Sequence, residues 1–126
     1  MNWFVNAYLP RYKISISVDL LGLVRQGVFG WMWASDCDYR PREFEIELHN
    51  RMTPENYTKT LLHELWHVHQ HVKGLLKDKH NKRLWKGIDH SETDYADQPW
   101  ERQANTMEEY LFTRYSKYLT RSNLSL

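Results

Sequence analysis

The segment that decides the fold runs from Thr53 to Gly74 and reads Thr-Pro-Glu-Asn-Tyr-Thr-Lys-Thr-Leu-Leu-His-Glu-Leu-Trp-His-Val-His-Gln-His-Val-Lys-Gly. Thr53 followed by Pro54 and an acid is typical of a helix start, because threonine caps free backbone N–H groups and proline fits the first turn. Gly74 is typical of the residue that follows a helix, where the backbone turns left-handed. The sequence therefore predicts one long helix that ends at about Lys73.

The motif His63-Glu64-Leu65-Trp66-His67 lies in the middle of this predicted helix. Residues four apart lie on the same face of an α-helix, so both imidazoles can reach one metal ion. Glu64 lies next to the first histidine, where its carboxylate can reach a metal-bound water without displacing it. This arrangement is typical of a zinc hydrolase in which the glutamate is the general base. The competing interpretation is a solvated polar helix face in a chain with 7 histidines.

A catalytic zinc site usually has three protein ligands and leaves the fourth position to water, so a third ligand is needed. A His-Glu-x-x-His-x-x-Gly-x-x-His metzincin is excluded, because Gln70 and Lys73 stand where that class has glycine and histidine. His71 lies about 12 Å from His63 along the helix axis, at ~1.5 Å per residue, which is too far for one shared ion. His69 points off the shared face by its angle on the helix. We therefore expect the third ligand to come from outside this helix.

Three candidates for the third ligand remain. His80 and His90 belong to a polar segment that could fold back on the motif. Glu101 lies in the first turn of a second predicted helix, over about residues 98–118, and Ala104 is small enough to let the two helices pack closely. We expect Glu101 to complete the site, with His80 and His90 as open alternatives.

Alternating apolar and polar residues predict strands in the first half of the chain. Lys13–Asp19 and Glu43–His49 both alternate in this way, and Val24–Ala34 is rich in β-branched and aromatic residues. Residues 2–9 could form a short helix or a strand. Because strands come first and helices afterwards, the sequence predicts the α+β class.

The predicted architecture is one domain over residues 1–126, since this length can bury a core without disulfides or metal staples. We expect a small antiparallel or mixed three-stranded sheet packed on two long helices, with an irregular loop over residues 77–97. Glu43–His49 is the candidate rim of a substrate cleft, and its three acids could favour basic substrates. The alternative is that these acids only protect an exposed sheet edge.

The composition excludes several classes of protein. The chain has 17 Lys and Arg against 16 Asp and Glu, so no nucleic-acid partner is predicted. Cys37 is the only cysteine, which excludes an internal disulfide and a zinc site with two or more cysteines, and suits a reducing compartment. No apolar run approaches the ~20 residues of a membrane span. We therefore expect a cytoplasmic protein without a membrane partner, and the oligomeric state is left open.

The second half of the chain resembles a known group of proteins. The segment Tyr95-Ala-Asp-Gln-Pro-Trp-Glu-Arg-Gln-Ala104, together with His63–His67 and Leu84-Trp-Lys-Gly87, resembles the small phage-encoded metallopeptidases with a Pro-Trp-Glu-x-x-Ala segment. Those proteins are similar to minigluzincins and to ImmA/IrrE-type peptidases, in which a Glu-x-x-Ala helix brings the third zinc ligand. The resemblance covers about residues 53–115.

The resemblance implies a zincin-like (minigluzincin-like) fold and a zinc-dependent metallopeptidase that hydrolyses protein or peptide substrates in a host cytoplasm. It implies that His63, His67 and Glu101 bind Zn²⁺ and that Glu64 is the catalytic base. SprT-like proteins use a later histidine as the third ligand, a place that His80 could take. The alternative function is therefore an SprT-like nucleic-acid-associated module, or a phage assembly factor, with a structural zinc site.

Two supporting roles are expected near the metal. A hydrogen-bond donor often stabilises the developing oxyanion, and Tyr95 and His90 are candidates because their segment precedes the third ligand. An acid is expected to orient one of the two histidine ligands, and Glu108 and Asp94 are candidates for that role.

Overall fold

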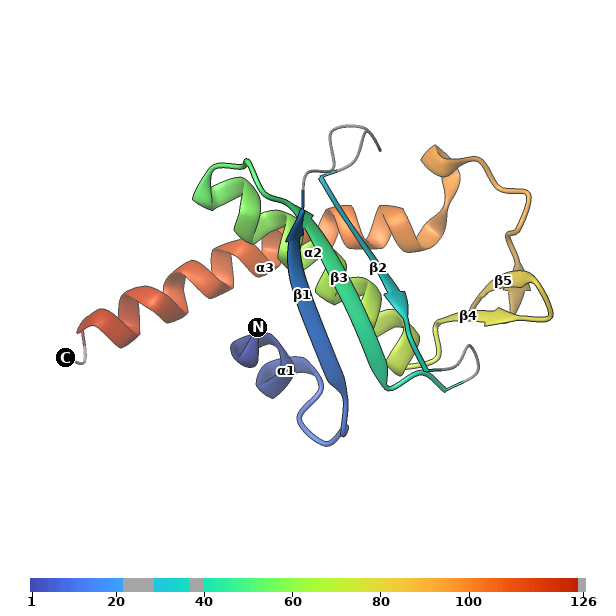
Figure 1. The fold of residues 1–126 in the computed structure, drawn as a ribbon, viewed down its shortest axis with the longest axis horizontal. Helices are drawn as coiled ribbons and strands as arrows, with labels where there is room; N and C mark the ends of the chain where they lie inside the picture. Colours follow the sequence, from blue (N-terminus) through green and yellow to red (C-terminus); the bar gives the residue numbers. More distant parts are fainter. Residues whose placement is uncertain (22–28, 37–39, 125–126) are drawn as a thin grey trace.

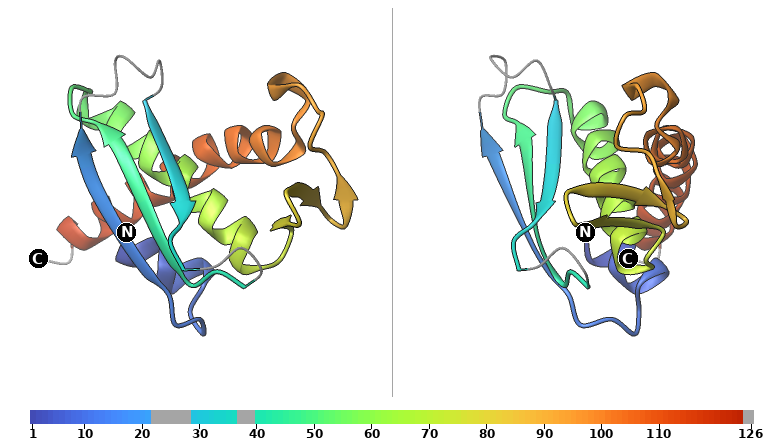
Figure 2. Two further views of the ribbon diagram at one scale, coloured as in Figure 1. Left: turned by 45° about the vertical axis from the view of Figure 1, so that its right-hand side comes forward. Right: turned by 90° about the vertical axis from the view of Figure 1, so that its right-hand side faces the viewer.

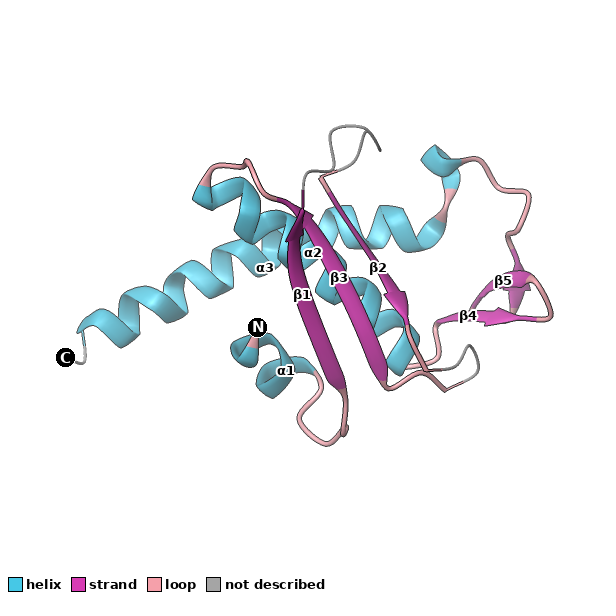
Figure 3. Ribbon diagram, viewed as in Figure 1, coloured by secondary structure: helices cyan, strands magenta, loops and turns pink. Residues whose placement is uncertain are grey.

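The computed structural model of this chain describes residues 1–21, 29–36 and 40–124 (Figure 1). The elements in chain order are α1 (Asn2–Tyr8), β1 (Ser15–Leu21), β2 (Gly30–Ala34), β3 (Glu43–His49), α2 (Pro54–Val72), β4 (Leu76–Lys79), β5 (Lys82–Trp85), β6 (Ile88–Asp89), the short 3₁₀ helix η2 (Tyr95–Asp97) and α3 (Pro99–Leu124). The predicted α+β class is confirmed, with long helices and short strands (Figure 3). Cys37 lies outside the described residues.

The first sheet is mixed and has three strands in the order β1-β3-β2. β3 pairs with β1 in parallel and with β2 in antiparallel orientation. The prediction that β3 forms the rim of a cleft is therefore wrong, because neighbouring strands occupy both of its edges. The edge strand on the side of the motif is β2. Residues 24–28 of the predicted strand that contains β2 lie outside the described residues.

One face of this sheet packs on α2, and no described helix covers the other face (Figure 2). The alternation in β3 produces this difference, since Phe44, Ile46 and Leu48 are buried. They belong to the same core cluster as Leu65 and Val68 of α2. The burial of these apolar side chains therefore determines how α2 packs against the sheet.

Gly30 explains how β2 comes close to α2. A Cβ atom at this position would lie 2.8 Å from Leu48 Cδ2 and 2.8 Å from Thr60 Cγ2. Distances that short do not occur between real carbon atoms, so only glycine fits here without a shift of its neighbours. The absence of a side chain thus allows the edge strand to pass directly over the motif helix.

The predicted start and end of α2 are confirmed. The Thr53 side chain accepts a hydrogen bond from the Asn56 backbone N–H at 3.2 Å, and Gly74 has a φ of +77°, which is the left-handed conformation expected after a helix. α3 begins at Pro99 as predicted but continues to Leu124. None of the described helices is both long and apolar enough to cross a membrane.

The predicted loop over residues 77–97 is wrong, because β4, β5 and β6 form a second small antiparallel sheet there. The β4–β5 turn consists of His80 and Asn81, which have positive φ values of 53° and 63°. Tight hairpins need such positive φ values to match the twist of their strands. A small cluster with Trp85 and Trp100 in its core packs this sheet against the start of α3.

Candidate metal centre

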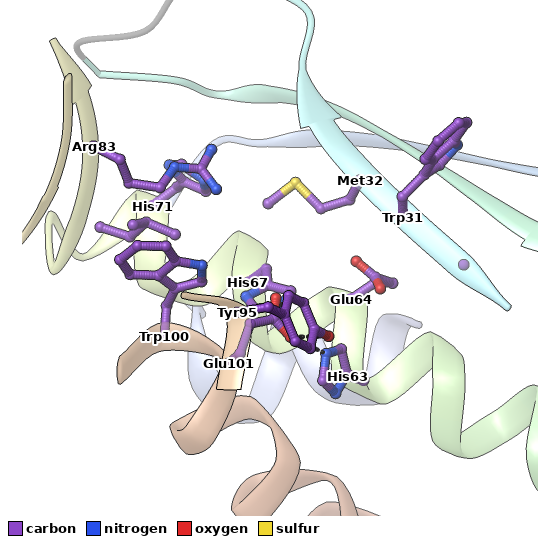
Figure 4. A pocket seen from close by; sticks show the side chains of 12 residues that line it. Trp31, Met32, His63, Glu64, His67, His71, Arg83, Tyr95, Trp100 and Glu101 are labelled. Carbon is purple, nitrogen blue, oxygen red and sulfur yellow. Dashed lines mark hydrogen bonds and ion pairs between the residues drawn. The ribbon is translucent and has the colours of Figure 1, made fainter. Parts of the chain in front are cut away.

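Two histidines of α2 and one glutamate of α3 lie together where the helices pack side by side (Figure 4). His63 Nε2 lies 3.2 Å from Glu101 Oε2, and His67 Nε2 lies 2.8 Å from Glu101 Oε1. The ligand atoms of the three residues all lie within 4.8 Å of one another. Ligands that surround a zinc ion tetrahedrally at ~2.1 Å are about 3.4 Å apart, so this trio needs only small movements to hold one ion. The three residues expected from the sequence are therefore brought together.

The hydrogen bonds of Gln70 fix the proton on the His67 ring. The amide N–H groups of Gln70 donate to the Trp100 carbonyl and to Gln103 Oε1, both at 3.0 Å. Its amide oxygen therefore faces His67 Nδ1, which lies 2.7 Å away and must be the donor. In neutral His67 the other ring nitrogen, Nε2, then carries a lone pair and no proton.

The unprotonated Nε2 atom lies next to the Glu101 carboxylate. His67 Nε2 is buried and has no hydrogen-bond partner among the described residues, although Glu101 Oε1 lies only 2.8 Å away. Two lone-pair atoms at this distance repel each other unless a cation lies between them. The cation is either a proton on the ring or a metal ion, and two imidazoles with one carboxylate form a ligand set that suits zinc. The donor set thus fits a metal ion on physical grounds.

The charges in the trio are strongly coupled. Burial alone would raise the pKa of Glu101, but the hydrogen bond with His63 and the charges of His63 and His67 hold that pKa well below its usual range. Burial opposes protonation of His63, yet its hydrogen bond with Glu101 and the negative charges of Glu64 and Glu108 raise its pKa above the ordinary value. Without a metal ion, the site therefore favours a negative Glu101 beside a positive His63.

Glu64 is buried next to the trio, and its carboxylate faces the space beneath β2 (Figure 4). Burial raises the pKa of Glu64, and the carboxylates of Glu101 and Glu108 add to this effect, while the two histidines oppose it. A carboxyl group with a raised pKa can both accept and return a proton closer to neutral pH. This is the property that a general base in a hydrolase needs.

Of the two acids expected to orient a histidine, Glu108 lies beside His63 and Asp94 does not lie at the site. Glu108 Oε1 lies 3.3 Å from His63 Nδ1, within ion-pair distance. Asp94 instead lies just before η2, where its carbonyl accepts a hydrogen bond from the Asp97 N–H. The partner of His67 is Gln70, a neutral amide where an acid was expected. Its spacing of three residues after His67 on the same helix was the available signal.

The other candidate ligands lie elsewhere. His80 is exposed at the tip of the β4–β5 turn. His90 Nδ1 lies 3.0 Å from Thr93 Oγ1, and the ring stands against Trp100. Neither belongs to the group of side chains that could hold a metal ion. Of the three candidates for the third ligand, Glu101 is therefore the one that lies beside His63 and His67.

Tyr95, one of the two candidate hydrogen-bond donors to the oxyanion, lies beside the trio. Its hydroxyl donates a hydrogen bond to Glu101 Oε2 at 3.0 Å. Burial and the Glu101 carboxylate raise the pKa of Tyr95 to about 12, so the hydroxyl keeps its proton at neutral pH. Tyr95 can therefore act as a neutral hydrogen-bond donor at the mouth of the site.

The trio of His63, His67 and Glu101 opens onto a cleft of about 230 Å³ between α2 and the edge strand. Trp31 and Met32 of β2 line it opposite the motif, with the Met32 side chain extending into it and the Trp31 ring turned away, and Trp100 and Arg83 line its far end (Figure 4). The sequence did not indicate these four residues, because their placement depends on which strand forms the edge and on the unpredicted small sheet.

Comparison of the chain with protein-family models, with curated proteins and with solved structures gives no match.

Proposed function

We propose that this protein is a zinc-dependent metallopeptidase with a zincin-like fold, of the small phage-encoded kind that its motifs resemble. The observation that carries the proposal is the buried Nε2 atom of His67, which lies 2.8 Å from Glu101 Oε1 without a hydrogen-bond partner among the described residues. His63 adds a second imidazole to the same space, and Glu64 lies beside it in the cleft. Protein or peptide chains are the proposed substrates.

In the proposed mechanism the metal ion would be held by His63, His67 and Glu101. Glu64 accepts a proton and later returns it. When bound, a zinc ion lowers the pKa of its water and polarises a substrate carbonyl. The Glu64 carboxylate accepts a proton from the attacking water and passes it to the leaving amine. The Tyr95 hydroxyl has a single proton, so it leaves Glu101 and donates its hydrogen bond to the carbonyl oxygen as negative charge develops there.

The alternative is a structural zinc in an SprT-like or phage assembly module. A structural site is closed by four protein ligands, whereas a catalytic site keeps one position open. Three candidate ligands gather among the described residues, and they open onto a cleft that contains Glu64. This arrangement supports the catalytic proposal over the structural one.

The proposal is tested with Glu64→Gln, which keeps the size of the side chain and removes its basicity. Zinc content is measured after dialysis, and cleavage is measured on casein and on a peptide library. We expect the variant to keep about one zinc ion per chain and to lose activity by roughly 10²–10⁴-fold, the usual contribution of a general base.

The matched control is Glu92→Gln, because Glu92 is an exposed acid outside the cleft. We expect it to keep both zinc and activity. The peptidase proposal is overturned if the wild-type protein retains no metal, or if Glu64→Gln cleaves as fast as the wild type.

A further inference from the structure

We propose that the far end of the cleft, formed by His71, Arg83 and Trp100, binds a carboxylate group of the substrate close to the scissile bond. This inference rests on the proposed peptidase function and names the chemistry that the enzyme would select. The carboxylate could belong to an aspartate or glutamate side chain, or to the C-terminus of a peptide.

Arg83 is held in place before any ligand arrives. Its guanidinium group donates from Nε and Nη2 to the two carboxylate oxygens of Asp78, at 2.8 and 2.9 Å, and stands over the Trp100 ring at 5.5 Å. Its backbone N–H donates to Ser91 Oγ at 3.0 Å, and its carbonyl accepts from the His90 N–H at 2.9 Å. A side chain fixed in this way loses little further conformational entropy when it binds a ligand.

Most of the hydrogen-bonding capacity of Arg83 is still free. A guanidinium group has five N–H donors, and Asp78 takes one from Nε and one from Nη2. Within the described chain the group makes no other hydrogen bond. Figure 4 shows the side chain extending over Trp100 toward the space that faces Met32. The remaining donors can therefore bind a carboxylate at two points.

The surroundings of Arg83 favour a short-range contact of this kind. Asp78 stays ionised because Arg83 lowers its pKa against the effect of burial, so the pair has almost no net charge. A bound carboxylate would then be selected by directed hydrogen bonds in a partly buried place rather than by a long-range field. Burial lowers the pKa of His71 to about 4, and the ring is neutral at pH 7.

An apolar wall lies beside this group. Leu76 and Trp100 are buried and line the same end of the cleft. They can cover the methylene groups of an acidic side chain while its carboxylate reaches Arg83. A pocket that combines one fixed polar group with apolar walls is typical of a specificity subsite.

The test compares peptides that differ in one position. A library of amidated peptides carries Glu or Gln at each place from three residues before to three residues after the cleaved bond, and a second set has a free or amidated C-terminus close to that bond. We expect wild-type cleavage efficiency to be about 10–100-fold higher for one acidic position than for its amide counterpart, the range for a charge-assisted hydrogen bond. The first set reports a side-chain carboxylate and the second a terminal one.

Two variants separate ligand binding from a purely structural role of the ion pair. Both Arg83→Gln and Asp78→Asn break the pair, but only Arg83→Gln removes the donors. We expect Arg83→Gln to abolish the acid preference and Asp78→Asn to retain it, with Lys82→Gln as a control that removes a neighbouring hairpin cation. The inference is overturned if both variants lower cleavage of acidic and amide peptides equally, or if Arg83→Gln keeps the preference.

Binding is measured separately from turnover with Glu64→Gln protein, by calorimetric titration of the same peptide pairs. If the wild type cleaves peptides with no acid preference, the carboxylate site fails and the peptidase stands. If no peptide is cleaved, yet acidic peptides bind and Arg83→Gln in the same background weakens only their binding, the peptidase fails and the carboxylate site stands.

Discussion

The Nδ1 atom of His67 lies 2.7 Å from Oε1 of Gln70, and both side chains are buried. The same amide donates to the backbone carbonyl of Trp100, the residue that precedes Glu101. One side chain therefore sets the ring of one candidate ligand and the position of the helix turn that carries another. Groups of this kind orient metal ligands in many proteins.

We predict that Gln70→Leu weakens zinc binding by about 10–100-fold, because it removes the acceptor for His67 Nδ1. Gln70→Glu keeps an acceptor at this point and is expected to retain more of the affinity. Competition with a chromogenic chelator measures both constants. Equal affinities for the leucine variant and the wild type would show that Gln70 has no part in the site.

In the metal-free protein, the stability contributed by the pairing of His63 with Glu101 should decrease as the pH rises above 6.5. The pKa of His63 is raised above its ordinary value of 6.5, so its pairing with Glu101 contributes stability fully below 6.5. That contribution is lost as the pH passes through the higher pKa of the folded state. The lowered pKa of Glu101 has the opposite sign and matters only in acid, below its ordinary value of 4.5. Thermal unfolding in the presence of a chelator, between pH 5.5 and 8.5, measures this trend.

Glu101→Gln is the control for this trend, because it removes the charge that pairs with His63. Relative to the variant, the wild type should therefore lose melting temperature as the pH rises above 6.5. Zinc affinity should change in the other direction and rise with pH, since the metal ion must displace protons from its ligands. His69 and His71, whose pKa values are lowered to about 4, add a rise in stability with pH in both proteins, so the pairing is judged from the difference between the two. The same pH dependence in wild type and variant would contradict the pairing.

Tyr95→Phe should lower kcat by roughly 10–10³-fold while zinc affinity stays within about threefold, because the hydroxyl is proposed to act on the developing oxyanion. The tyrosine side chain is largely exposed, so its removal should leave the melting temperature nearly unchanged. Steady-state kinetics and chelator competition give the two constants. A loss of zinc affinity as large as the loss of kcat would instead assign Tyr95 to holding Glu101.

Ala104→Leu should destabilise the protein by about 1–3 kcal/mol, the usual cost of overpacking a buried position. Ala104 is fully buried in the core cluster that contains residues of both α2 and α3, so a larger side chain would push the helices apart. Zinc binding should weaken together with stability, because the ligands come from both helices. Ala96→Leu is the control, since Ala96 is exposed in η2. Denaturant unfolding and zinc titration of both variants measure the difference.

The sequence predicted the parts of the fold that follow local rules. The cap at Thr53, the left-handed residue Gly74 and the alternating strand Glu43–His49 are local patterns, and the structure has them where they were expected. The alignment of His63 with His67 also follows from such a rule, because residues four apart share a helix face. Glu101 was expected from its place at the start of a second helix and from the resemblance, with His80 and His90 left open.

Long-range pairing could not be read in the same way. Alternation in β3 predicts a strand but does not tell whether the strand lies at the edge or in the centre, which depends on where the chain returns. The hairpin of β4 and β5 is rich in Lys and Arg, and its turn has His80-Asn81 rather than a glycine-containing pair. The sequence of this hairpin therefore does not predict strands. The position of Arg83, which lies on β5, could not be predicted either.

The contact between α2 and α3 at one site has a consequence for the stability of the segment that joins them. His63 and Glu101 are 38 positions apart in the chain, and the whole second sheet lies between them. An ion bound by both helices would act as a removable cross-link, which closes this long loop and reduces the freedom of the unfolded chain. Chelation should then release the loop first, and protease cleavage between β4 and η2 should become faster well before the first sheet unfolds.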